Sequence, residues 1–201
     1  AAAVKPGDEV LDCACGTGDL TLAFARTPAK AVIGLDFTPE MLDLARVKTD
    51  RATDRKPGLP ATVRYLQGDA QALPFEDASF DGLSIAFGIR NVQQPERAIR
   101  EFHRVLRPGG RLVILEFDRP TFPPVRWFND FYCGQVMPRT ATLISRDTSG
   151  AYKYLPRSVG SFMDSRQLAE LMQGTGFERV ERKPLSLGIC VRTLGHKPAA
   201  V

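Results

Sequence analysis

Three aspartates and a pair of glycines stand where an open α/β sheet would bind a nucleotide-like ligand. Gly16 and Gly18 belong to the turn DCACGTGD and permit the positive φ and the close ligand approach of such turns. Asp12 stands at the end of the apolar run before that turn, Asp36 ends the next run, and Asp69 follows a third. Because the carboxyl ends of parallel strands meet at one edge of a sheet, we expect these carboxylates to surround a single crevice.

Two ligands suit this arrangement, a dinucleotide and S-adenosylmethionine (SAM). A dinucleotide turn carries a third glycine three residues after the second, where this chain has Thr21. The negative charge of Asp12 would repel a pyrophosphate but suits the ammonium of a methionine moiety, contacted directly or through the backbone. Asp36 can accept both ribose hydroxyls of either ligand. The balance favours SAM and leaves a nicotinamide oxidoreductase as the weaker alternative.

Asp69 and Ala70 help to distinguish between the two candidate ligands and favour SAM. A carboxylate at this position can accept the exocyclic amine of adenine, while the neighbouring N–H meets a ring nitrogen. We also expect Asp19 to cap the helix after the glycine turn. The predicted cofactor-binding residues are Asp12, Gly16, Thr17, Gly18, Asp36, Phe37, Met41, Asp69, Ala70 and Ala86.

The elements that must position these residues follow from the apolar pattern. Apolar runs of strand length alternate with amphipathic stretches of helix length, which predicts a Rossmann-like, doubly wound α/β fold with a mostly parallel sheet. Predicted strands cover residues 9–13, 31–36, 62–67, 80–87 and 111–117. Predicted helices cover residues 19–26, 39–50, 95–106 and 165–174, with a loop at 51–60. Residues 177–185 and 187–194 are expected to close the sheet as an antiparallel hairpin.

The composition corresponds to one soluble globular domain, with 43% hydrophobic and 25% charged residues in 201. We expect residues 1–201 to form a single methyltransferase domain, in which the aromatic, proline-bearing residues 118–164 are a helical lid or acceptor-binding insertion. The four cysteines fit neither zinc-site nor secreted disulfide spacing, so we expect no metal and a cytoplasmic protein. No apolar run reaches membrane-spanning length.

The net charge of +4 is unevenly distributed along the chain. Residues 119–201 contain 12 basic and 6 acidic side chains. This excess would attract an anionic phospholipid surface, although a solvated face is the simpler explanation because the charges are dispersed. We expect no nucleic-acid partner.

The chain resembles the ubiquinone/menaquinone biosynthesis C-methyltransferases in five strings, VLDCACGTGDLT, GLDFTPEML, GDAQALPFEDASFD, FGIRNV and RVLRPGGRLVILEF. The resemblance covers residues 10–197. The first three strings and RVLRPGG occur in many SAM-dependent enzymes. More specific to the quinone-methylating branch are FGIRNV, FNDFY, AYKYLPRSV and LGICVRTLGHKP.

The resemblance implies that Thr17, Asp36, Asp69 and Ala70 contact SAM and that a polyprenyl quinol is the methyl acceptor. Relatives that act on both ubiquinone and menaquinone precursors often have serine where this chain has Ala86, so demethylmenaquinol is the expected acceptor. The chain does not begin with methionine, so we expect its start to be trimmed. The resemblance also implies additional helical residues before the first strand that help cover SAM. A SAM methyltransferase for another small acceptor and a catalytically silent SAM-binding protein are the alternatives.

The predicted catalytic residues are Arg90, Asn91 and Tyr154. Arg90 and Asn91 follow the fourth strand, where the acceptor should lie. A guanidinium stays protonated, so Arg90 would stabilise a developing phenolate or orient a water, with a surface ion pair as its alternative role. Tyr154 would line the acceptor cavity or hydrogen-bond the quinol.

Two expectations concern partners of the chain. A lipid-borne acceptor would require peripheral contact with the inner face of the membrane. A homodimer is a further expectation.

Overall fold

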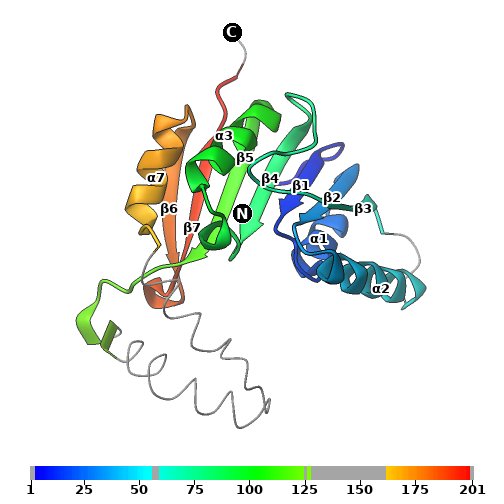
Figure 1. Cartoon of the computed structure of the whole chain (residues 1–201), viewed down its shortest axis with the longest axis horizontal. Helices are drawn as coiled ribbons and strands as arrows, with labels where there is room; N and C mark the ends of the chain where they lie inside the picture. Colours follow the sequence, from blue (N-terminus) through cyan, green and yellow to red (C-terminus); the bar gives the residue numbers. More distant parts are fainter. Residues whose placement is uncertain (1–2, 56–58, 125, 128–161, 200–201) are drawn as a thin grey trace.

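The computed structural model describes residues 3–55, 59–124, 126–127 and 162–199. Within them, seven strands form one sheet in the order β3-β2-β1-β4-β5-β7-β6 (Figure 1). Their bounds are β1 Glu9–Cys13, β2 Ala31–Asp36, β3 Thr62–Gln67, β4 Phe80–Ala86, β5 Leu106–Phe117, β6 Glu178–Leu185 and β7 Cys190–His196. Strands β1 to β5 run parallel, and β7 is antiparallel to both β5 and β6. The predicted fold class, a mostly parallel sheet with a C-terminal antiparallel hairpin, is confirmed.

Helices cover both faces of the sheet, as a doubly wound fold requires. α1 (Asp19–Ala25) and α2 (Pro39–Arg55) pack on one face, and α3 (Pro95–Val105) and α7 (Ser165–Gly174) pack on the other (Figure 1). A short 3-10 turn, η1 (Ile89–Asn91), follows β4, and another, η3 (Ser186–Gly188), joins β6 to β7. The carboxyl ends of the parallel strands therefore carry the loops that hold the predicted site.

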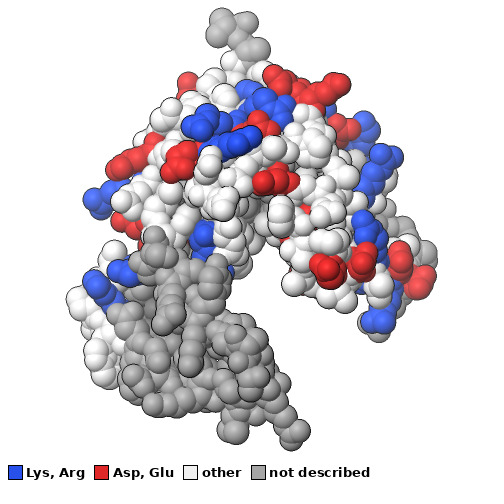
Figure 2. All heavy atoms as spheres, viewed as in Figure 1, with Lys and Arg blue, Asp and Glu red and all other residues white. Residues whose placement is uncertain are grey.

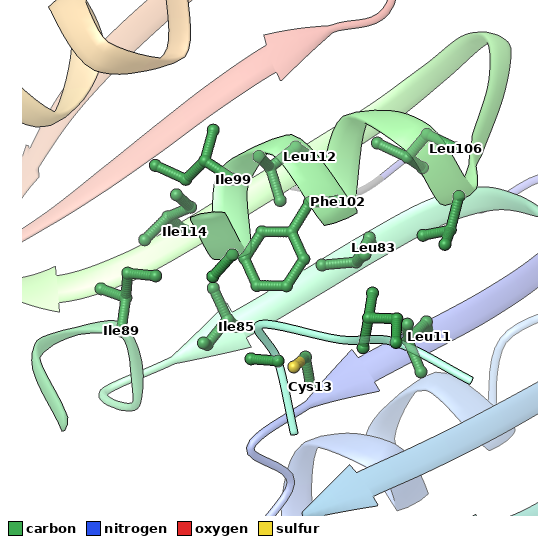
Figure 3. Packing of buried hydrophobic residues seen from close by; sticks show 14 of the residues in the cluster. Leu11, Cys13, Leu83, Ile85, Ile89, Ile99, Phe102, Leu106, Leu112 and Ile114 are labelled. Atoms are coloured by element: carbon green, nitrogen blue, oxygen red, sulfur yellow. The ribbon is translucent and has the colours of Figure 1, made fainter. Parts of the chain in front are cut away.

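The larger core cluster fixes α3 against the centre of the sheet (Figure 3). Pro95 suits the first helical position, because its fixed φ is helical and its missing N–H would have no partner there. Apolar residues at 98, 99, 102 and 105 then form one buried stripe. Phe102 is fully buried against residues such as Leu83 and Ile114, and such burial contributes about 1.5–3 kcal/mol. The core thus holds β4 and β5 in register under α3.

Two predicted boundaries before the C-terminal hairpin are each wrong by five residues. α2 continues to Arg55 instead of ending at 50, because residues 51–55 have ordinary helix propensity and Pro57 is the first strong breaker in the sequence. β5 begins at Leu106 rather than at 111. Leu106 pairs with Phe80, and a register shift between Phe80 and Gly82 accommodates the proline and glycines at 108–110. These residues mark an irregularity inside a strand pair and not the turn that the sequence predicts.

The C-terminal hairpin exists as predicted, but its turn is longer. Ser186 and Leu187 have φ values of 48° and 58°, in the left-handed region that non-glycine residues rarely adopt. The chain turns through η3, and β7 starts at Cys190 rather than at 187. A run of suitable apolar residues therefore does not show where the turn ends.

Candidate functional site

A cavity of about 620 Å³ lies at the carboxyl ends of β1, β2 and β4. Its volume is ordinary for a small-molecule site. The predicted site residues that line it are Gly16, Asp36, Phe37, Met41, Asp69, Ala70, Ala86 and Asn91. Four others within the described ranges are not among the lining residues, namely Asp12, Thr17, Gly18 and Arg90. Tyr154 lies outside the described residues.

Asp36 joins the glycine turn to the start of α2. Its Oδ2 accepts a 2.7 Å hydrogen bond from the Gly16 N–H, and its Oδ1 accepts a 2.9 Å bond from the Thr38 N–H. Each carboxylate oxygen keeps a second lone pair, so both can accept ligand hydroxyls. Gly16 has a φ of 53°, and a Cβ placed on it would meet no atom within 4 Å. The turn therefore offers backbone, carboxylate and open space to a ligand.

Tyr65 of β3 supports the glycine turn. A Cβ on Gly18 would lie 2.5 Å from the Tyr65 Oη, and a Cβ on Gly34 would lie 2.7 Å from the tyrosine ring. The Tyr65 hydroxyl shares a 2.8 Å hydrogen bond with the hydroxyl of Thr49 in α2. Gly18 is also held at a φ of 80° as the N-cap of α1. Packing and backbone conformation, and not the cavity, require the second glycine.

Asp12 is buried beneath the turn. Its Oδ2 accepts a 2.6 Å hydrogen bond from the Thr21 hydroxyl, and its Oδ1 accepts a 3.0 Å bond from the Ser84 hydroxyl. Burial raises the pKa of Asp12 to about 6, against the opposing effect of these two donors. Thr21, at the position of a third glycine, therefore has a structural role as a donor to Asp12. Asp12 is buried and does not line the cavity, and its predicted contact with an ammonium, directly or through the backbone, stays a prediction.

The predicted cap by Asp19 is wrong. Gly18 is the N-cap of α1 and no side chain caps it, so Asp19 stands one residue too late and is the first residue of the helix. Its carboxylate accepts hydrogen bonds from the Thr17 hydroxyl at 3.2 Å and from the Lys48 ammonium at 2.8 Å. The bond from Lys48 lowers the pKa of Asp19. Lys48 also donates to the Thr17 Oγ1 at 2.7 Å, so this network ties the turn to α2.

The part of the cavity predicted for adenine combines a carboxylate with apolar surface. Asp69 accepts a 2.8 Å hydrogen bond from the Gln71 backbone N–H and bonds of 3.1 Å from the Gln71 side-chain amide. Ala70 is buried beside it, whereas Phe37 and Met41 are 72% and 41% exposed at the cavity. Large exposed apolar side chains next to a cavity can cover the faces of a planar base.

Residues 86–93, at the end of β4 and in the loop after it, form a further wall. We call it the acceptor wall, because we expect the methyl acceptor there from the sequence. Ala86, Phe87, Gly88 and Asn91 line the cavity. Gly88 packs closely on the glycine turn, since a Cβ there would lie 2.5 Å from the Cβ of Ala14. Phe87 has a φ of 56°, a strained conformation for an aromatic residue. The string FGIRNV therefore lies directly beside the glycine turn.

Arg90 belongs to the acceptor wall but does not line the cavity, and its side chain forms an ion pair with Glu116. The Arg90 Nη1 lies 2.6 Å from the Glu116 Oε1, and the two side chains are 8% and 6% exposed. Burial raises the pKa of Glu116, opposed by hydrogen bonds from the Phe117 N–H and from Arg90. The alternative role predicted for Arg90 was an ion pair at the surface, and the observed pair is buried.

Several lining residues and one supporting residue are not among those predicted. The additional lining residues are Cys13, Ala14, Leu35, Thr38, Gly68, Gln71, Phe87, Gly88, Val92 and Gln93. Most of them adjoin a predicted residue in the sequence, so a prediction that included the neighbours of each motif residue would have found them. Tyr65 gave a different signal, because an aromatic residue in register with Gly34 of the neighbouring strand fills the space that the glycine leaves.

Comparison with known proteins places this geometry in a family. The model of the ubiE/COQ5 methyltransferase family matches residues 1–197. The chain belongs to the ubiE/COQ5 methyltransferase family. Within that family, the ubiquinone/menaquinone biosynthesis C-methyltransferase UbiE of Cronobacter sakazakii is 40% identical over 196 residues, which are 96% of this chain and 76% of that protein. The UbiE protein of Citrobacter koseri is 39% identical over the same lengths.

Solved structures agree with the ubiE/COQ5 assignment at the level of fold. A SAM-dependent methyltransferase from Aquifex aeolicus superposes with a TM-score of 0.67 at 18% identity, covering 96% of this chain and 84% of that one. One from Methanosarcina mazei gives 0.66 at 22% identity, covering 98% and 95%. These likenesses show the class I methyltransferase fold.

The residues present fit SAM. The cavity joins the lone pairs of Asp36, the apolar surface of Phe37 and Met41, and the Asp69–Ala70 segment. The open space over Gly16 lets a ligand approach the backbone. Together with the family, this makes the chain a SAM-dependent methyltransferase. The nicotinamide oxidoreductase and the silent SAM-binding protein are thereby set aside.

Proposed function

We propose that this methyltransferase transfers the methyl group of SAM to a ring carbon of a polyprenyl quinol, with demethylmenaquinol as the acceptor. The observation that carries the proposal is the place of FGIRNV, the string specific to the quinone-methylating branch, in the cavity wall beside the glycine turn. The names of the 39–40% identical UbiE proteins, which refer to C-methylation in ubiquinone and menaquinone biosynthesis, support it.

The acceptor wall offers groups that suit a quinol ring. When bound, SAM supplies a methyl group activated by its positively charged sulfur. Transfer needs the acceptor carbon about 3 to 3.5 Å from that methyl in a site that excludes water. Phe87 and Val92 present apolar surface for the ring, and the Asn91 amide can hydrogen-bond a ring oxygen. Loss of a proton from a quinol oxygen makes the ring carbon nucleophilic, and the proton on that carbon leaves after transfer.

Arg90 and Tyr154 complete the proposed catalytic set with Asn91. The guanidinium of Arg90 is paired with Glu116 and does not line the cavity, so its positive charge would act on a developing phenolate without leaving that pair. Tyr154 would hydrogen-bond the quinol. We expect Arg90→Lys and Tyr154→Phe each to lower kcat while leaving the Kd for SAM unchanged. An unchanged kcat in either variant removes that residue from the set.

A methyl-transfer assay with radiolabelled SAM tests the acceptor. Demethylmenaquinol in detergent should accept the label with a higher kcat/KM than soluble phenols of similar ring structure. A preference for the soluble phenols would favour the alternative, a methyltransferase for another small acceptor. Calorimetric titration with SAM on the same preparation shows whether the enzyme is competent, so inactivity with every quinol despite SAM binding would reject the quinol assignment alone.

We also propose peripheral contact with an anionic membrane at the same edge of the sheet. Three large apolar side chains in η3 and in the segment after β5 are exposed: Leu187 is 79%, Trp127 70% and Phe122 62% exposed. The hydrogen bond from the Asp118 N–H to the Ile189 carbonyl holds the two segments together. Figure 2 shows Lys and Arg atoms at this end of the molecule, at the lower left. Apolar and basic groups together suit an anionic lipid surface.

Vesicle co-sedimentation tests the membrane contact. None of the helices in the described ranges has both the length and the apolar character to cross a bilayer. We expect binding to vesicles that contain phosphatidylglycerol, weaker binding to neutral vesicles, and a loss for Leu187→Ser. Equal binding to both kinds of vesicle would reject the proposal. The homodimer stays a prediction, for which sedimentation velocity is the test.

A further inference from the structure

The ion pair of Arg90 and Glu116 is unusual for its burial. Taking two charges out of water costs free energy that their attraction only partly returns, so such a pair adds little net stability. A packed apolar pair would fill the same space without that cost. The pair therefore calls for an explanation other than the stability of the fold, and its hydrogen bonds suggest one.

Glu116 holds the acceptor wall at more than one point. Its Oε1 accepts hydrogen bonds from the Arg90 Nη1 at 2.6 Å and from the Phe117 N–H at 2.8 Å, and its Oε2 lies 3.4 Å from the Arg90 backbone N. The same Arg90 Nη1 donates to the Phe87 carbonyl at 2.7 Å. The carboxylate on β5 thus fixes both the side chain and the backbone of the turn after β4.

Phe87 is the residue that most needs this support. Its left-handed φ of 56° is strained, and such conformations persist when surrounding contacts over-determine them. Its N–H donates to the Leu115 carbonyl at 2.8 Å, its carbonyl accepts from Arg90, and its ring packs on the Phe117 ring with centroids 4.6 Å apart. The Arg90 guanidinium lies 5.3 Å from the centroid of that second ring. Each of these contacts comes from β5 or from Arg90.

We propose that Glu116 is a positioning residue for the methyl acceptor: through Arg90 it holds Phe87 and Asn91 in the geometry in which they line the cavity. Glu116 itself borders a different, small cavity formed with Leu168 and Thr193, so it acts through the wall and not on the substrate. The inference rests on the proposed function, because the acceptor is what the wall would contact.

Glu116→Gln is the main test, with Asp8→Asn as its matched control. Asp8 forms a comparable buried ion pair with Arg111 at the amino end of the same sheet, and the two side chains are 11% and 10% exposed. Hydrogen exchange followed by mass spectrometry on the SAM-bound enzyme reports local opening and needs no acceptor. We expect exchange in residues 86–93 to be about tenfold faster in Glu116→Gln and unchanged in Asp8→Asn.

Kinetics then separate positioning from general stability. In Glu116→Gln we expect the KM for the quinol to rise about tenfold, a larger change than in kcat, with the Kd for SAM unchanged. The double variant Arg90→Met/Glu116→Leu removes both charges and should recover the Tm but neither the slow exchange nor the KM. Unchanged exchange in Glu116→Gln, or equal acceleration in Asp8→Asn, would overturn the proposal. If the wild-type enzyme methylates no quinol, the proposed function fails while the exchange experiment still decides whether Glu116 holds the wall.

Discussion

The two sides of the cavity are held by different means. On the cofactor side, the groups that face the ligand are fixed by backbone geometry: glycines occupy left-handed positions, and the Asp36 carboxylate accepts backbone N–H groups. On the acceptor side, a strained turn is fixed by a buried pair of charged side chains, Arg90 and Glu116. Backbone-fixed sites leave a pattern of residue types in the sequence, whereas sites fixed by distant side chains leave almost none.

Gly18→Val should break the cofactor side most severely. The new side chain meets the Tyr65 Oη, which lies 2.5 Å from the Cβ position, at a residue whose φ is 80°. We expect the free energy of unfolding to fall by about 3–5 kcal/mol, measured by denaturant titration. Gly174→Ala is the control, because nothing lies within 4 Å of its Cβ position, and it should be neutral or stabilising. Equal losses in both variants would contradict the account of the turn.

Asp12→Asn probes the buried carboxyl beneath the turn through pH. Burial raises the pKa of Asp12 from its ordinary 3.8 to about 6, so the folded state binds this proton more tightly than the unfolded state. The stability from this group is therefore present in full below about pH 4 and falls as the pH rises through about 6, by at most about 3 kcal/mol. The free energy of unfolding of the variant, relative to the wild type, should rise over that window. A difference that does not change with pH would show that Asp12 keeps an ordinary pKa.

The limits of sequence reasoning follow the same division. Gly16, Asp36 and Asp69 were predicted as site residues because each follows or ends a strand. The carboxyl ends of parallel strands meet at one edge of the sheet, so the topology alone brings these residues together. The partner and the burial of the Arg90 ion pair were not predicted, because Glu116 lies 26 residues away beyond α3 and meets Arg90 only once β4 and β5 pair. For the alternative role of Arg90, residue type suggested an ion pair at the surface, whereas packing buries the pair.

The predicted end of α2 and the predicted cap of α1 were wrong for a related reason. The composition of residues 51–60 suggested a loop, but helix propensity is a weak preference and α2 extends until a proline approaches. Asp19 looked like a cap because its residue type suits one. The left-handed Gly18 occupies the cap position instead, and a backbone angle is not visible in residue types.

Asp36→Asn should weaken SAM binding by about 30-fold, because one carboxylate oxygen becomes an amide that cannot accept a hydrogen bond. Either the bond from the Gly16 N–H or that from the Thr38 N–H is then lost, together with a contact to the ligand. Titration calorimetry with SAM measures the change. Asp43→Asn, an exposed substitution on α2, should leave the Kd unaltered. A Kd for Asp36→Asn within twofold of the wild type would mean that ribose hydroxyls do not bind there.

The smallest expected effect belongs to the acceptor side, at Ala86. This residue lines the cavity at the end of β4. A serine here is what the resemblance described in the sequence analysis leads us to expect in enzymes that also act on ubiquinone precursors. Ala86→Ser adds one hydroxyl to the wall, and an apolar pocket discriminates only weakly on such a change, so we expect the ratio of kcat/KM for ubiquinone-type to menaquinone-type quinols to rise about threefold. Ala23→Ser, exposed on α1, is the control. Because Ala86 lies outside the contacts of Glu116, its variant should alter preference without the faster exchange of residues 86–93. If Ala86→Ser changed both the acceptor preference and the exchange of residues 86–93, the chemistry of one side chain could not be separated from the geometry of the wall. The contrast drawn here between the cofactor side and the acceptor side would then be wrong.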